Sequence, residues 1–256
     1  MSVLNLCDET QKTCNKATPM NNIVDRFKCG GDKSGDHEAE AEPRQFSNCK
    51  LPFSNLLENG AFLITDSELH YELANKGWYG SRYEAQYDIE LDEKIILKGE
   101  FVWALTPEEL IYLVCERQIF EVTYRMPSGI QSYTKDELYL EIMCRNLTEA
   151  FSLTVYRELR TLGYVVRCDN NYGGIFTIYE GNPAKHHSAA IIYHEKDDIL
   201  EYSAFLRVGN TVNKSVIVAA LLSDPIDEDC YDLSKVNVRY TLYDMERPEG
   251  LALAFN

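Results

Sequence analysis

The sequence predicts an α/β protein, with an α+β N-terminal lobe followed by a C-terminal domain whose mixed sheet is flanked by helices. Three observations support this fold class. The segment from Val216 to Leu222 is almost wholly apolar, as expected of a strand buried on both faces. Beyond Gly163 the apolar pattern changes from a helical period to alternation. The hydrophobic fraction of 45% and the 17 tyrosines fit a globular core rich in sheet.

The first part of the chain is expected to be a disordered acidic arm, at residues 1–55. Residues 1–50 are polar, show no apolar period and contain the acidic run Asp36–Glu42. A solvating tail explains this composition better than a docking motif. Structure is expected to start near Gly60.

An N-terminal lobe is expected at residues 56–132. Thr65 and Glu68 have the spacing of a capping box, which opens a helix that Gly77 closes. Thr106-Pro107-Glu108-Glu109 is a second and more complete helix start, with a cap, a proline and a glutamate in the right order. Strands are expected at 61–64, within 88–98 and at 119–124.

The C-terminal domain is expected at residues 133–248, before a tail at 249–256. Its longest helix runs from a cap at Thr134 to Gly163, with Arg157, Glu158 and Arg160 toward solvent. A second helix covers 201–213, where Gly209 is a weak point. Alternating or apolar runs predict strands at 164–167, 175–179, 188–193, 216–222 and 236–243.

Charge and cysteine content limit the possible functions. The net charge of −16 argues against holding nucleic acid by bulk electrostatics, so a small basic site or a partner chain would have to supply positive charge. No apolar run reaches the roughly 18–20 residues that span a bilayer. The start of the chain lacks the pattern of a signal peptide, so we expect an intracellular chain with free thiols. The spacing of Cys7, Cys14, Cys29 and Cys49 fits no zinc site, and buried thiols are expected at Cys115, Cys144, Cys168 and Cys230.

Three side chains near the C-terminus suit cleavage of RNA without a metal: Tyr179, His187 and Lys214. Attack by a 2′-hydroxyl on its neighbouring phosphate needs a base, an acid and a positive charge. The proton of histidine moves near neutral pH, and lysine is a compact cation for developing phosphate charge. Tyrosine is a weaker base, because its ordinary pKa is about 10. Taken singly, each residue also has a structural explanation without catalysis. Tyr179 could be a packing residue, His187 a surface side chain, and Lys214 a cation that stabilises a helix end.

Their order and surroundings resemble those of the tRNA-splicing endonuclease family. The resemblance rests on the segment 156–166, then Gly173 before Ile175-Phe176, Tyr179, His187-Ser188, and Arg207 seven residues before Lys214. It extends over 59–248, because the first lobe is also similar to the family's N-terminal domain. The stretch Lys76–Gly80 resembles the eukaryotic subunit that cuts the 5′ splice site.

The resemblance implies a restriction-endonuclease-like nuclease domain in a catalytic subunit that cuts precursor tRNA in the nucleus and needs no cofactor or metal. Tyr179, His187 and Lys214 would be its catalytic residues. Arg207 would help to hold a flipped-out intron base, with Arg239 and Arg247 as further substrate-binding candidates. Partners would be a second catalytic subunit and structural subunits. The loop carrying Asp224, Asp227, Glu228 and Asp229 would dock into a basic cleft of one of them.

Two other functions stay open. The chain departs from the family pattern at Asp169, Asn171 and Ile175, so it could be a structural subunit of the same complex that does not cut. A metal-dependent DNA nuclease of related fold would need clustered carboxylates beside a lysine. The strand at 175–179 carries none, which disfavours that alternative.

Overall fold

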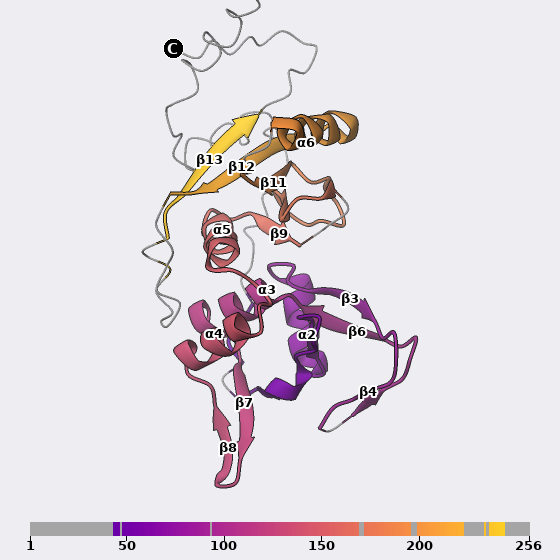
Figure 1. Cartoon of the computed structure of the whole chain (residues 1–256). Coiled ribbons are helices and arrows are strands. Elements are labelled where there is room, and N and C mark those ends of the chain that lie inside the picture. The colour runs from indigo at the N-terminus through magenta and orange to yellow at the C-terminus, as the bar shows by residue number, and fades with distance from the viewer. Residues whose placement is uncertain are drawn as a thin grey trace, which may run out of the picture.

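The computed structural model describes residues 43–46, 48–92, 94–168, 172–195, 199–222, 233 and 236–243 (Figure 1). Small sheets and short helices make up the N-terminal lobe, and a five-stranded sheet lies between α5 and α6 in the C-terminal part. This mixed architecture confirms the predicted fold class. Within the described part of the chain, no helix is both long and apolar enough to cross a membrane.

The N-terminal lobe contains three small sheets, with strand orders β2-β6-β3, β1-β7-β8 and β4-β5. The β7–β8 hairpin extends away from the C-terminal sheet (Figure 1). The elements of this lobe are β1 (Lys50–Pro52), η1 (Phe53–Asn55), β2 (Phe62–Ile64), α2 (Ser67–Asn75), β3 (Ser81–Glu84), β4 (Ile89–Glu90), β5 (Ile95–Ile96), β6 (Phe101–Leu105), α3 (Pro107–Ile111), the π-helical turn η2 (Tyr112–Glu116), β7 (Glu121–Met126) and β8 (Gly129–Ser132).

Structure begins earlier than the sequence predicts. β1 pairs in parallel with β7, and Leu51 and Phe53 are buried in the main core. The predicted start near Gly60 is therefore wrong. A three-residue strand has too short an apolar pattern to detect, and its partner lies about 70 residues further along the chain.

The helix starts were predicted with different success. Thr106 and Glu109 form the predicted capping box, as do Thr134 and Glu137. Helix α2, however, begins one residue later than predicted, because the carboxylate of Asp66 and not Thr65 accepts from the Leu69 N–H at 2.7 Å. Both residue types cap helices well, so the sequence alone did not separate them.

Several strands of the lobe depart from prediction. The segment 88–98 holds the short strands β4 and β5 rather than one strand, and neither β6 nor β8 was predicted. All four residues of β8 are exposed, so this strand has no apolar alternation that would reveal it.

The predicted longest helix is two helices, α4 (Lys135–Cys144) and α5 (Ala150–Thr161). The chain leaves the helical path at Asn146, whose φ is 53°. Asparagine tolerates this left-handed conformation better than most residues. The break turns Cys144 to the surface, and Cys168 is also exposed, so their predicted burial is wrong while that of Cys115 is confirmed. Cys230 lies outside the described residues.

The C-terminal sheet has the strand order β13-β12-β11-β10-β9. Its elements are β9 (Val165–Arg167), β10 (Phe176–Tyr179), β11 (Ala190–His194), α6 (Ile199–Val212), β12 (Ser215–Leu221) and β13 (Val238–Tyr243). β11 and β12 are parallel and α6 connects them, whereas the other neighbours are antiparallel. Residues 216–220 are buried, which confirms a strand covered on both faces.

The two faces of this sheet pack on different helices. Phe176, Ile178 and Ile192 face the main core with α5, while Ile191, Val216 and Val218 face α6. The prediction that Arg157, Glu158 and Arg160 point to solvent is wrong. Arg157 donates to the Leu233 carbonyl, Glu158 accepts from the Tyr240 hydroxyl, and Arg160 donates to the Gly77 and Tyr164 carbonyls.

Gly209 is where α6 approaches the sheet. A Cβ built on Gly209 would lie 2.5 Å from Cγ2 of Val216 and 3.0 Å from the Lys214 carbonyl oxygen. Gly209 therefore lowers the helix propensity of α6 but is required for the close packing of this helix against β12. We expect Gly209→Ala to lower the free energy of unfolding by about 1–3 kcal/mol, as overpacking usually does. Chemical denaturation measures this, and a stability equal to that of the unsubstituted chain would contradict the packing argument.

The two parts of the molecule meet at the Lys76–Gly80 stretch. Arg160 donates to the Gly77 carbonyl at 3.0 Å and stacks over the Tyr79 ring, and Arg167 donates to the Gly80 carbonyl. Glu109 accepts from the Gly80 N–H at 2.9 Å. This stretch, together with the arginines and Glu109, is called the inter-lobe joint below.

Glu109 gives the joint a pH dependence. Burial raises the pKa of its carboxyl, despite the opposing charge of Arg167. The pKa of this carboxyl is higher in the folded protein than in the unfolded chain, where it is near 4.5. Its contribution to stability is therefore fully present below the unfolded pKa and is lost as the pH rises through the folded pKa. Relative to Glu109→Gln, the unsubstituted protein should therefore lose stability as the pH rises above about 4.5. Urea unfolding at several pH values measures the difference, and a pH-independent difference would refute it.

Candidate active site

Three adjacent strands bring Tyr179, His187 and Lys214 to one edge of the C-terminal sheet. Tyr179 is the last residue of β10, His187 precedes the start of β11, and Lys214 immediately precedes β12. β10 is antiparallel to β11, and β11 is parallel to β12. The end of β10 and the starts of the next two strands therefore lie at the same edge.

The register aligns these positions closely. Ile178 pairs with Ala190, and Ala190 pairs with Ser215. One residue further toward the edge, Tyr179 and Lys214 lie on either side of Ala189. Two strand spacings separate their Cα atoms by about 10 Å, so two long side chains can reach a common phosphodiester.

The strand alternation also places Tyr179 and Lys214 on one face. Thr177 pairs with Ile191, which packs toward α6, and Tyr179 is two residues from Thr177. Val216, two residues after Lys214, packs toward α6 as well. Both side chains therefore belong to the face that α6 partly covers.

Lys214 is held close to the loop that carries His187. Its ammonium donates to the Ser188 carbonyl at 3.2 Å and lies 5.7 Å from the centre of the Tyr172 ring. Asn213, with a φ of 53°, ends α6 in the left-handed conformation, and the Lys214 N–H donates to the Gly209 carbonyl at 3.0 Å. The helix end thus fixes the backbone from which the ammonium extends.

The loop between β10 and β11 is ordered by its own backbone. Asn182 accepts through Oδ1 from the Ala184 N–H at 2.8 Å, and its carbonyl accepts from the N–H groups of Lys185 and His186. His186 and His187 are both exposed, and Ser188 is buried. His187 lies in this loop two residues before Ala189, so the chain brings it to the edge that carries Tyr179 and Lys214.

The remaining substrate-binding candidates lie apart from one another. Arg207 is exposed on α6, about two turns before Lys214. Arg239 is opposite Ala220 at the other end of β12, roughly 20 Å from the edge that carries Lys214, and its guanidinium pairs with Glu195 at 2.9 Å. Arg247 and the loop residues Asp224, Asp227, Glu228 and Asp229 lie outside the described residues.

Two features of this region were missed by the sequence reasoning. The Ser188 carbonyl that holds Lys214 is a backbone atom, so no residue type signals it. Tyr172 is one of 17 tyrosines and stands beside a turn, where its ring had no predicted partner. His194, at the end of β11, is partly buried and stacks on Phe151 with ring centroids 4.1 Å apart.

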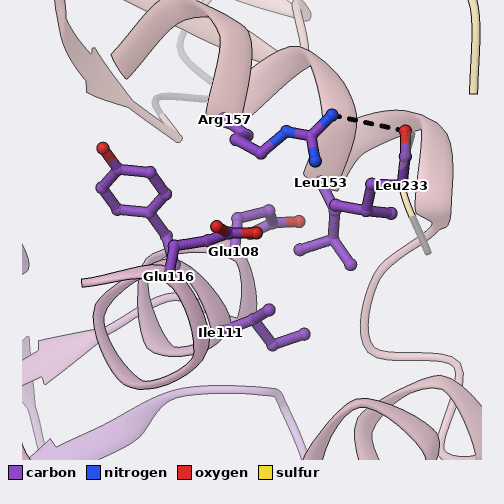
Figure 2. A pocket seen from close by; sticks show the side chains of 7 residues that line it. Glu108, Ile111, Glu116, Leu153, Arg157 and Leu233 are labelled. Carbon is purple, nitrogen blue, oxygen red and sulfur yellow. Dashed lines mark hydrogen bonds between the residues drawn. The ribbon is translucent and has the colours of Figure 1, made fainter. Parts of the chain in front are cut away.

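A small pocket lies elsewhere, between α3, η2 and α5. Its lining includes Glu108, Glu116, Arg157 and Leu233, and Figure 2 shows Arg157 reaching the Leu233 carbonyl beside it. None of Tyr179, His187 and Lys214 lines this pocket. Among the described residues, no three His, Cys, Asp or Glu side chains gather closely enough to hold a metal ion.

Comparison with known proteins identifies the family. Residues 150–227 match the model of the tRNA intron endonuclease catalytic C-terminal domain. The tRNA-splicing endonuclease of Methanothermobacter thermautotrophicus is 31% identical over 198 residues, which cover 72% of this chain and 92% of that protein. The tRNA-splicing endonuclease of Pyrobaculum arsenaticum is 28% identical over 173 residues, covering 66% of this chain and 91% of that protein. Because the similarity extends over nearly the full length of these relatives, the chain belongs to the tRNA-splicing endonuclease family.

Proposed function

We propose that this chain is a cutting subunit that excises introns from precursor tRNA. Its relatives are named as tRNA-splicing endonucleases, which supports the substrate class. The observation that carries the cutting role is that a phenol, an imidazole and an ammonium, on Tyr179, His187 and Lys214, occupy one edge of three adjacent strands.

The reaction follows from the chemistry of these groups. Tyr179, acting as general base in its phenolate form, takes the proton of the 2′-hydroxyl at the splice junction and becomes a neutral phenol. The 2′-oxygen then forms a bond to the adjacent phosphorus, and the bond from phosphorus to the 5′-oxygen breaks. His187 donates a proton to that leaving oxygen. Lys214 stabilises the negative charge of the phosphorane, and the Ser188 carbonyl holds its ammonium beside the His187 loop. The products are a 2′,3′-cyclic phosphate and a 5′-hydroxyl.

Arg207 is the candidate in this chain for substrate binding outside the cleavage centre. It is an exposed cation on α6, the helix that leads to Lys214. A guanidinium in this position can stack on an unpaired base of the intron. A role for Arg239 has less support, because Glu195 already neutralises it at the far end of β12.

The chain is proposed to act within a nuclear complex, as the subunit that cuts the 5′ splice site. The net charge of −16 opposes tight RNA binding by the chain alone, so a second catalytic subunit and structural subunits would supply positive surface. The acidic loop at 224–229 is the proposed docking segment. Co-purification from isolated nuclei tests the location and the partners together, and recovery of the chain outside the nucleus without partners would contradict both.

The nature of the cut ends tests the chemistry. The assembled complex should cleave an intron-containing precursor tRNA in EDTA and leave 2′,3′-cyclic phosphate and 5′-hydroxyl ends, because no step needs a metal. End-labelling before and after phosphatase and kinase treatment identifies the ends. Products with 3′-hydroxyl and 5′-phosphate ends would reject this mechanism.

A further inference from the structure

The ammonium of Lys214 lies close to the ring of Tyr172, a residue that has no part in the proposed mechanism. A lysine ammonium stands on a flexible four-carbon stem, so its place in space is poorly fixed by its backbone alone. Stabilising a phosphorane requires that this charge be in place before the reaction. The Ser188 carbonyl fixes the ammonium from one side at 3.2 Å. The ring of Tyr172, whose centre is 5.7 Å away, is a second fixed neighbour.

The backbone of Tyr172 is itself anchored in the sheet. Its carbonyl accepts from the Tyr193 hydroxyl at 2.8 Å. Tyr193 is only 2% exposed and stacks on Phe205 of α6, with ring centroids 4.0 Å apart. The aromatic contact with Lys214 therefore connects, through the buried ring of Tyr193 and the partly buried ring of Phe205, to the helix that crosses from β11 to β12.

We propose that Tyr172 is a positioning residue, whose ring holds the Lys214 ammonium at the cleavage edge; the inference rests on the proposed role of Lys214. A cation within about 6 Å of a tyrosine ring is attracted to its face. Together with the Ser188 carbonyl, the ring leaves the ammonium fewer orientations, so that it is held at the edge where the phosphate must sit. Tyr172 also packs against the α6-facing cluster. A purely structural role there would affect stability but not the chemical step.

Two substitutions separate the ring from the hydroxyl. Tyr172→Leu removes the ring and keeps an apolar side chain, and Tyr172→Phe keeps the ring. With the assembled complex and a precursor tRNA, we expect Tyr172→Leu to slow single-turnover cleavage about fivefold to thirtyfold, without changing KM, as loss of one cation–π contact allows. Tyr172→Phe should cleave at nearly the unsubstituted rate. Equal rates for Tyr172→Leu and the unsubstituted chain, or equal losses in both variants, would overturn the inference.

A double substitution tests whether Tyr172 acts through Lys214. In a Lys214→Ala background, Tyr172→Leu should cause no further loss, because the group that it positions is gone. A further loss of the same size would show that Tyr172 acts elsewhere. If Lys214→Ala alone keeps the full rate, the proposed function fails. If Lys214→Ala slows cleavage but Tyr172→Leu does not, only the positioning role of Tyr172 fails.

The matched control is Tyr202→Leu. Tyr202 packs in the same α6-facing cluster, and its hydroxyl donates to Glu195, away from Lys214. It should lower thermal stability without slowing the cleavage step. Should Tyr172→Leu unfold the protein, Tyr172→Met provides a second variant without a ring. A rate loss in Tyr202→Leu as large as that in Tyr172→Leu would reject the positioning role.

Discussion

Replacing His187 with alanine is expected to reduce cleavage at one splice junction by about 10²–10⁴-fold, because the leaving 5′-oxygen loses its general acid. His187 is exposed in the loop before β11, so its removal leaves no buried group unpaired and should not disturb folding or assembly. Single-turnover cleavage of a precursor tRNA by the assembled complex, with each junction followed separately, measures the loss. Loss at the 5′ junction alone would support the proposed site of cutting.

His186→Ala is the control for this experiment. It removes an imidazole from the adjacent residue, which is also exposed and whose ring lies beside Gly181 of its own loop. Its cleavage rate should match that of the unsubstituted chain. A structural subunit predicts a different result, with full cleavage at both junctions in both variants. That outcome would reject the cutting role while leaving the family assignment intact.

The elements that were predictable from sequence are those set by local chemistry. The caps at Thr106 and Thr134 lie within four residues of the groups that they bond, and the apolar run before Leu222 needs no partner to be recognised as a buried strand. The break between α4 and α5 was not predictable, because Leu147 and Phe151 continue the apolar period across it. Asn146 carries no signal as strong as proline or glycine.

In the candidate site, too, the residue types were predictable from sequence, whereas contacts between distant segments were not. Residue types and their order pointed to Tyr179, His187 and Lys214, and the resemblance to a family gave them roles. Their common edge, however, depends on the register of three strands, which is set by packing between distant segments. The contacts of Lys214 with the Ser188 carbonyl and the Tyr172 ring depend on that register too, so no local pattern could reveal them.

Replacing Arg160 with alanine should have the largest effect on stability, lowering the free energy of unfolding by about 3 kcal/mol. The sequence placed this side chain in solvent, but its guanidinium donates to the Gly77 carbonyl at 3.0 Å and to the Tyr164 carbonyl at 3.1 Å. It also lies over the Tyr79 ring at 4.1 Å. Alanine leaves both carbonyls without this donor and opens a gap at the inter-lobe joint.

Two further arginine substitutions show whether stability depends on the planar guanidinium of Arg160, which bonds two carbonyls at once. Arg160→Lys keeps the charge but cannot reach two carbonyls with one planar group, so it should fall between alanine and the unsubstituted chain. Arg145→Ala removes an exposed arginine that pairs with Glu141 one helical turn away and lies over the Phe53 ring at 4.8 Å, and it should cost no more than about 1 kcal/mol. Chemical denaturation measures all three. Because Arg160 contacts the N-terminal lobe rather than the cleavage edge, the rate per folded Arg160→Ala complex should be unchanged. Equal stabilities for Arg160→Ala and Arg145→Ala would mean that the joint does not depend on Arg160.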